Sequence, residues 1–220
     1  MVQMKKVIDG VLAGLMISLG GVAFMALYSD SKIVGALLFS VGLLCVCWKG
    51  YSLFTGKIGL VIDHHTKEDI SVLLLGLLGN TVGAVAMGYL IAYAIPVVGD
   101  NALLACTAKL TQGYLSAFIR AIFCGVLIYL AVDIYKNKKS TLGIIFCVPA
   151  FILSGYEHSI ADIFYFAASG IASAKALLYI WIVIAGNSVG GLLIPAFNLL
   201  SKVKIKKKNS EENPDNSEKK

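Results

Sequence analysis

The sequence predicts an all-α membrane protein with six transmembrane helices in two inverted three-helix repeats. The first reason is composition. The 220 residues are 58% hydrophobic and only 15% charged, with a mean hydropathy of +0.80, whereas about a quarter of the residues in a soluble domain are charged. The other reasons are three long segments without a charged residue and a motif that occurs once in each half. These features exclude a soluble enzyme and a nucleic-acid-binding protein, and they make a lipid bilayer the expected surroundings.

Three of the expected helices are uninterrupted, since a transmembrane helix needs about 20 predominantly apolar residues. The charge-free segments, which we expect to be helices one, three and six, are residues 10–29, 70–99 and 176–201. The fourth expected helix, residues 110–132, contains a single charged residue, Arg120. A charge at membrane depth needs a partner, and Glu157 and Asp162 are both candidates.

Helices two and five are expected to be broken because polar residues interrupt them. Helix two covers residues 33–62 and helix five covers residues 140–174. The interrupting residues are Lys49 and Lys57 in the second helix, and Glu157, His158 and Asp162 in the fifth. We expect non-helical gaps at residues 50–56 and 154–162. Such gaps leave backbone groups unpaired, so they must line a wet cavity or be packed inside the protein.

The distribution of lysines predicts the orientation. With a cytoplasmic N-terminus, thirteen lysines fall in cytoplasmic segments, and only Lys32, Lys109 and Lys175 fall outside. Positive residues favour the cytoplasmic side, so we expect a multi-pass protein of the plasma (inner) membrane with both termini in the cytoplasm. Residues 1–200 form the expected transmembrane domain. Residues 201–220 are lysine-rich and lack aromatic residues, which predicts a disordered cytoplasmic tail.

An internal repeat links the two broken helices. The motif G-N-[ST]-V-G-[AG] occurs at residues 79–84 and 186–191, and one interrupted helix precedes each copy. Each half then holds three helices, and an odd number requires the second half to be inverted relative to the first. Inverted halves with broken helices indicate a transport site near the bilayer midplane, and the positive ends of half-helices there favour an anion. The glycines spaced four residues apart within each motif are typical of close helix packing.

Several polar residues at the expected membrane depth each allow two interpretations. Asn80 and Asn187 either tie down backbone groups of the broken helices or contact a permeating molecule. His158 either holds its break together or lines a pore and donates a proton or hydrogen bond, because an imidazole with an ordinary pKa of about 6.5 protonates reversibly. Lys109 is either an anchor outside the membrane or a pore-mouth charge that concentrates anions.

The motifs together resemble the formate/nitrite transporter family, whose known substrates include formate, nitrite and hydrosulfide. The matching stretches run in the family's order over residues 1 to about 200. They are Phe39-Ser40-Val41-Gly42, Ser52-Leu53-Phe54-Thr55, Gly79-Asn80-Thr81-Val82-Gly83, Ser154-Gly155-Tyr156-Glu157-His158-Ser159-Ile160-Ala161 and Gly186-Asn187-Ser188-Val189-Gly190-Gly191. The glutamate-histidine stretch is the most specific of them.

The resemblance implies an aquaporin-like protomer in a homopentamer, with one pore through each protomer for a small-molecule anion. It implies the following site: Leu53, Phe54 and Thr55 in the loop of the broken second helix, the central histidine His158 facing Thr55, Asn187 beside the histidine, Phe39 and Phe151 as aromatic constrictions on the cytoplasmic and outer sides, and Lys109 as the lysine of the outer pore. Glu157, Asn80 and Asp162 support that site.

Two positions depart from the family pattern. Gly125 and Asp162 stand where the resemblance implies asparagines. The first change removes a polar contact from the pore, and the second adds an acid near the site. Both changes favour the hydrosulfide branch of the family over formate as the substrate.

The expected function is therefore a channel or transporter for small monovalent anions or their weak acids. A neutral acid crosses apolar constrictions far more easily than its anion. The alternative is an aquaporin-like channel for small neutral solutes, although no Asn-Pro-Ala element occurs. An enzyme is not expected, because the Glu157-His158 pair lacks a nucleophile or a metal-binding partner set. The five cysteines show no metal-ligand spacing, so we expect no metal and no cofactor.

Overall fold

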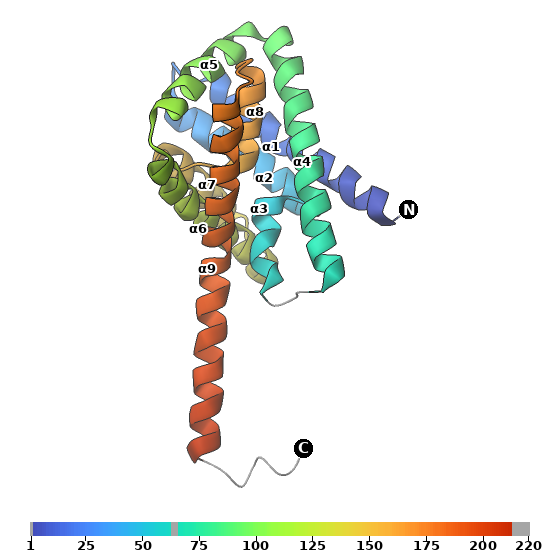
Figure 1. Ribbon diagram of the computed structural model, residues 1–220, viewed down its shortest axis with the longest axis vertical. Helices are drawn as coiled ribbons and strands as arrows, with labels where there is room; N and C mark the ends of the chain where they lie inside the picture. Colours follow the sequence, from blue (N-terminus) through green and yellow to red (C-terminus); the bar gives the residue numbers. More distant parts are fainter. Residues whose placement is uncertain (1, 63–65, 213–220) are drawn as a thin grey trace.

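The computed structural model describes residues 2–62 and 66–212, and within these residues all regular structure is helical (Figure 1). The elements, in order, are α1 (Val2–Ala26), α2 (Lys32–Lys49), α3 (Phe54–Lys57), the 3-10 helix η1 (Ile58–Val61), α4 (Lys67–Ala94), α5 (Pro96–Thr111), α6 (Tyr114–Lys138), α7 (Leu142–Leu153), α8 (Ser159–Ala168) and α9 (Ala174–Glu212). The predicted all-α class is confirmed.

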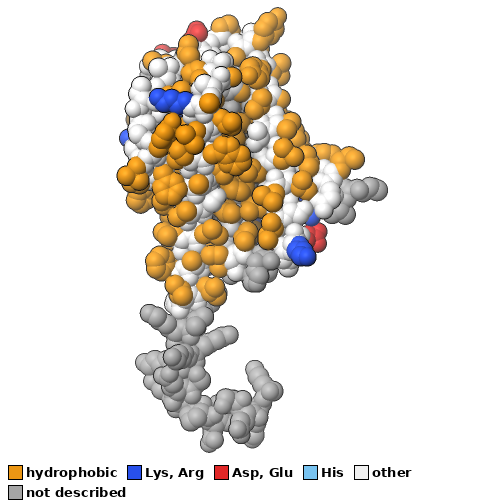
Figure 2. Space-filling model, in the orientation of Figure 1, with side chains coloured by type: hydrophobic (Ala, Val, Ile, Leu, Met, Phe, Trp, Pro, Cys, Tyr) orange, Lys and Arg blue, Asp and Glu red, His pale blue; other side chains and the backbone are white. Residues whose placement is uncertain are grey.

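Five of these helices are long and apolar enough to cross a membrane. They lie within α1, α2, α4, α6 and α9, and α7 and α8 are shorter apolar helices. Large hydrophobic side chains remain exposed on these helices, among them Leu78, Phe123 and Trp181. Hydrophobic side chains cover much of the face shown in Figure 2. Such a surface suits contact with lipid rather than water.

The most extensive helix contacts pair α1 with α4 and α6 with α9. The repeated glycines allow both contacts. A Cβ atom added at Gly83 would lie 2.3 Å from the carbonyl oxygen of Val11 in α1, and one added at Gly190 would lie 1.9 Å from the carbonyl oxygen of Ile122 in α6. Neither backbone could move away cheaply, so both positions require glycine. The predicted role of these glycines in close packing is confirmed.

The chain turns earlier after α4 than the sequence suggested. The third helix was expected to cover residues 70–99, but α4 ends at Ala94 and Pro96 begins the separate helix α5. Ile95 is extended, with φ −135° and ψ 82°, because the proline ring disfavours helical geometry in the residue before it. Proline suits the first position of a new helix. In Figure 1, α5 crosses the end of the bundle between α4 and α6, and it carries Lys109.

The last helix is longer than expected. A disordered segment was predicted from Ser201, but α9 continues without interruption to Glu212 (Figure 1). No glycine or proline occurs between Ser201 and Glu212, and lysine and glutamate are good helix formers. The predicted boundary at residue 200 is therefore not the end of the helix. Residues 213–220 of the predicted tail lie outside the described residues.

Candidate functional site

Two short non-helical turns have the same backbone design. Gly50 follows α2 with φ +70°, and Gly155 follows α7 with φ +69°. The backbone N–H of the next residue then reaches back to close each helix, from Tyr51 to Val46 O at 3.0 Å and from Tyr156 to Phe151 O at 2.9 Å. This is the usual glycine-based helix ending. The non-helical residues, 50–53 and 154–158, form shorter gaps than the sequence predicted.

Asn80 of α4 holds the first turn. Its amide nitrogen donates to the carbonyl oxygens of Gly10 and Ser52, both at 2.8 Å. Its amide oxygen accepts the backbone N–H of Phe54 at 2.9 Å. The side chain is fully buried, so two of these bonds satisfy the turn carbonyl of Ser52 and the N–H of Phe54, and the third ties the turn to Gly10 of α1.

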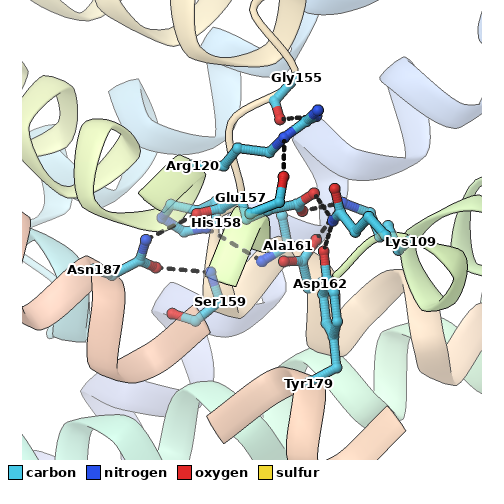
Figure 3. A network of polar contacts seen from close by, with 12 residues as sticks. Lys109, Arg120, Gly155, Glu157, His158, Ser159, Ala161, Asp162, Tyr179 and Asn187 are labelled. Carbon is cyan, nitrogen blue, oxygen red and sulfur yellow. Dashed lines mark hydrogen bonds and ion pairs between the residues drawn. The ribbon is translucent and has the colours of Figure 1, made fainter. Parts of the chain in front are cut away.

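Asn187 of α9 holds the second turn in the same way. Its amide nitrogen donates to the carbonyl oxygens of Ala121 and Glu157, both at 2.8 Å, and its amide oxygen accepts the backbone N–H of Ser159 at 2.8 Å. Figure 3 shows the bonds to Glu157 and Ser159. The sequence left two interpretations open for Asn80 and Asn187. In the structure both side chains tie down backbone groups.

His158 is the last residue of the second turn and the N-cap of α8. Its Nδ1 accepts the backbone N–H of Ala161 at 3.2 Å, and its Nε2 lies 2.9 Å from Oγ1 of Thr55. A nitrogen that accepts a hydrogen bond carries no proton. The geometry therefore corresponds to a neutral imidazole that donates from Nε2 to Thr55. His158 and Thr55 are both buried, so the structure brings these two expected site residues together.

The two phenylalanines of the expected constrictions lie next to each other. The ring of Phe151 stacks on His158 with centroids 5.7 Å apart, and Phe39 meets Phe151 edge to face at 6.0 Å. They form one aromatic group instead of the expected pair of barriers on opposite sides of the histidine. The reason is that α2 and α7 pack against each other and bring both rings to one contact. Phe54 lies in a separate cluster with Ile58 and Leu73.

Lys109, which the sequence offered as a pore-mouth charge or as an anchor outside the membrane, lies at the centre of a largely buried ion cluster. Its Nζ forms ion pairs with Oε2 of Glu157 and, at 3.0 Å, with Oδ1 of Asp162. Glu157 also accepts a hydrogen bond from Gln112 at 2.8 Å, and Gln112 donates to the hydroxyl of Tyr179. Figure 3 shows Glu157, Asp162 and Tyr179 around Lys109. One lysine is therefore shared by two buried acids.

Arg120 contacts neither of its two candidate partners through their side chains. Its Nη1 donates to the carbonyl oxygen of Gly155 at 3.1 Å, and its Nε donates to Oγ of Ser116 at 3.3 Å. The guanidinium group is exposed and thus keeps access to solvent or headgroups at the membrane surface. Arg120 consequently supports the glycine of the second turn instead of neutralising an acid.

Two cavities approach this region. The larger one, which we call the histidine cavity, has a volume of about 460 Å³, and its lining includes Lys109, Arg120, Phe151, His158 and Asp162. The smaller one, of about 150 Å³, is lined by Leu53, Tyr51, Lys57 and Lys136 among others. Leu53 is two residues before Thr55, the partner of His158.

Some site features were missed although the sequence contained a signal. A Gly-Tyr pair occurs in both turns, at residues 50–51 and 155–156, and the same spacing of 105 residues relates residues 50–53 to residues 155–158. Gln112 and Tyr179 had no such signal. Within residues 2–62 and 66–212, no group of three or more His, Cys, Asp or Glu side chains could hold a metal ion.

Known proteins match this chain over most of its length. Formate-nitrite transporter 2 of Toxoplasma gondii is 27% identical over 184 residues, which cover 74% of this chain and 40% of the relative. The uncharacterized transporter YrhG of Bacillus subtilis is 28% identical over 211 residues, which cover 86% and 76%. The chain thus spans less than half of the Toxoplasma protein.

A solved structure has the same fold. A pentameric formate channel with formate bound superimposes with a TM-score of 0.79 at 22% identity, covering 92% of this chain and 98% of the channel chain. The sequence model of the formate/nitrite transporter family matches residues 1–200. The relatives and structural neighbours are transporters and channels, not enzymes. With several membrane-capable helices and a family match over nearly its whole length, this multi-pass membrane protein belongs to the formate/nitrite transporter family.

Proposed function

We propose that the chain passes small monovalent anions, or their weak acids, across a membrane through a path inside the protomer. The observation that carries this proposal is the position of His158, which lines the histidine cavity and contacts Thr55 on its far side. Leu53, two residues before Thr55, lines the smaller cavity, which we assign to the other part of the path. Family membership supports formate, nitrite and hydrosulfide as the candidate substrates.

Buried apolar side chains lie along the proposed path, so water must leave the ion before it passes. Phe151 lines the histidine cavity, and Phe39 and Leu53 are almost fully buried. An unhydrated anion in such surroundings is costly, whereas its neutral acid is not. Oγ1 of Thr55 accepts the hydrogen bond from the Nε2–H of His158. Its own hydroxyl proton therefore stays available to donate to a permeating molecule. Together, these groups favour small weak acids over larger or strongly hydrated ions.

The proposed architecture is an inverted repeat with broken helices two and five. The two turns support it, because their positions correspond at a constant spacing of 105 residues and because Asn80 and Asn187 make the same three kinds of hydrogen bond. The pairing of α1 with α4 and of α6 with α9 supports it further. In this arrangement both turns meet near the bilayer midplane, where His158 and Thr55 form their contact.

The proposed assembly is a homopentamer in a plasma (inner) membrane with both termini in the cytoplasm. The likeness of the fold to that of the pentameric formate channel and the exposed apolar side chains support the assembly. The excess of lysines in the segments assigned to the cytoplasm supports the orientation.

A flux panel in proteoliposomes tests the proposed function. The full-length protein is reconstituted, and uptake of formate, nitrite, acetate, hydrosulfide and glycerol is compared with uptake by protein-free liposomes. We expect at least one of the small anions to enter faster than in the control and glycerol to be excluded. Passage of glycerol with refusal of every anion would contradict the proposal and favour a channel for small neutral solutes.

A further inference from the structure

The two acids of the ion cluster are not equivalent. Oxygens of Glu157 accept from both Lys109 and Gln112. Asp162 contacts Lys109 through Oδ1 only, and its buried Oδ2 has no hydrogen-bond partner in the described part of the chain. Both side chains are almost fully buried, with exposed fractions of 4% for Glu157 and 1% for Asp162. A buried carboxylate oxygen without a partner is a costly arrangement.

The charges in the cluster indicate where a proton resides. Lys109 contributes one positive charge, whereas two ionised carboxylates would contribute two negative charges. One lysine can neutralise one acid, and like charges at close range oppose the ionisation of both. Glu157 has more partners for its negative charge, so the remaining proton belongs on Asp162. With that proton in place, the cluster is neutral and no longer repels an incoming anion.

His158 does not supply a proton in this geometry. Its Nδ1 accepts a hydrogen bond from the backbone of Ala161, and its Nε2 proton is engaged by Thr55. A second proton on Nδ1 would face the N–H of Ala161 and lose that bond. Among the acids and bases that line the histidine cavity, Asp162 is left as the group with an exchangeable proton and an unused oxygen.

We propose that Asp162 is the proton donor of the histidine cavity and converts an entering small anion into its neutral acid. The inference rests on the proposed function, because it assumes that an anion enters this cavity. The O–H bond of Asp162 breaks as a new bond forms to the anion, and the neutral acid then moves past Phe151 and His158. Asp162 remains as a carboxylate paired with Lys109, and it regains a proton from the solution that fills the cavity.

Other ionisable groups surround Asp162 and define what the test must separate. Lys109 and Cys106 face it from α5, Glu157 faces it from the turn, and the other groups that interact with it are Cys124 of α6, Tyr165 of α8 and Tyr179 of α9. Arg120 and Lys32 line the same cavity. The tyrosines and cysteines ordinarily ionise well above neutral pH, and lysine and arginine stay charged there. His158 lines the cavity as well, but its Nδ1 is engaged by the N–H of Ala161, so the two carboxyl groups are the ones whose protonation a mildly acidic pH range tests.

The experiment compares the wild type with Asp162→Asn as a ratio of fluxes. Initial formate or nitrite uptake is measured in proteoliposomes while the outside pH varies between about 5.5 and about 7.5, a range in which a proton donor should change state. Because the ionisation of the permeant itself affects both proteins equally, it cancels in the ratio. We expect the wild-type to D162N ratio to fall by about tenfold as the pH rises through this range.

Three further variants make the outcome specific. Asp162→Glu keeps a carboxyl group and should retain the pH slope even if D162N assembles poorly. Glu157→Gln removes the competing carboxylate, so Asp162 becomes the only acid paired with Lys109 and should ionise more readily. The pH dependence of the flux should then move to lower pH. Asp133→Asn removes an acid that does not line the cavity and should behave as the wild type.

The results can separate this inference from the proposed function. If D162N carries the anion with the wild-type pH slope, the donor role of Asp162 is overturned while the channel function stands. The same holds if D162E loses the slope. If neither wild type nor variant carries any anion, the proposed function fails and this inference fails with it.

Discussion

The turn at residues 50–53 and the turn at residues 154–158 have similar backbones, but their side chains differ in chemistry. Both contain a left-handed glycine, and an asparagine from a later helix fastens each one with three hydrogen bonds. In the first turn the side chains after Gly-Tyr are Ser52 and Leu53. In the second turn they are Glu157 and His158, which bring an ion cluster and an imidazole to the same place.

The comparison separates what builds the path from what gives it selectivity. The asparagine and the glycine serve the backbone in both turns, so they are structural requirements of interrupting a helix in hydrocarbon. Leu53 offers only an apolar wall. His158 and Glu157 are the residues by which the second turn differs, so the ionisable groups of the proposed path come from that turn. Thr55, in the helix that follows the first turn, forms a hydrogen bond with His158.

The largest effect is expected from breaking the ion cluster of the second turn. Lys109→Met leaves Glu157 and Asp162 buried without their cation, and such a loss costs about 3–5 kcal/mol of unfolding free energy. Thermal unfolding in detergent measures the loss. Among the described residues, no equivalent ion cluster lies at the first turn, so no single lysine change near it should match this effect.

The triple variant Lys109→Met, Glu157→Gln, Asp162→Asn is the control for that prediction. It removes the cation and both buried carboxylates together, so most of the lost stability should return. If the single and triple variants are equally unstable, the lysine stabilises the fold through packing of its side chain and not through charge.

The asparagines should have similar effects on the two turns. Asn80→Leu and Asn187→Leu keep the volume but leave two buried backbone groups unpaired in each case: Ser52 O and Phe54 N–H in the first turn, and Glu157 O and Ser159 N–H in the second. Each unpaired group costs about 1–3 kcal/mol before the structure relaxes, so we expect a loss of about 3 kcal/mol for each variant. Thermal unfolding of both proteins in one detergent provides the comparison. A stable N80L beside an unstable N187L would show that the turns are not equivalent.

Replacing the histidine makes the second turn chemically like the first. His158→Leu removes the contact to Thr55 and the ring that stacks on Phe151. We expect anion flux to fall by about a hundredfold, which corresponds to about 2.7 kcal/mol. Oligomer size by light scattering should be unchanged, because Asn187 continues to hold the backbone. Wild-type flux in H158L would contradict a role for the imidazole and leave the path with apolar walls alone.

The sequence was sufficient to predict those features that depend on residues close together in the chain. The charge-free runs predicted the helices that became α1, α4 and α9, and the repeated glycines predicted their close packing. The stretch from Ser154 to Ala161 drew attention to His158 because ionisable residues are rare at membrane depth. Even Pro96 carried a local signal for the start of α5, although the apolar run around it concealed the helix boundary.

The remaining features depend on how distant segments meet. Lys109 is 48 residues before Glu157, and nothing in either segment shows that α5 places the lysine between two acids. Phe39 and Phe151 were expected apart and lie together because α2 and α7 pack against each other. Arg120 had two acidic candidates and instead contacts a carbonyl oxygen, because the turn presents Gly155 O to it. Contacts of this kind follow from tertiary structure and not from spacing.

The smallest effect should come from the two left-handed glycines, and it should still distinguish the turns. A Cβ added at Gly50 meets nothing within 4 Å, whereas one added at Gly155 lies 3.1 Å from Nη1 of Arg120. Both Gly50→Ala and Gly155→Ala bear the strain of a left-handed alanine, about 1 kcal/mol. Because the arginine head is flexible and can move aside, G155A should lose only a little more stability than G50A. Thermal unfolding checks this, and the double variant G155A with Arg120→Ala should remove the difference. A much larger loss in G155A would mean that the contact from Arg120 to the carbonyl oxygen of Gly155 is a main support of the second turn, in addition to the bonds from Asn187.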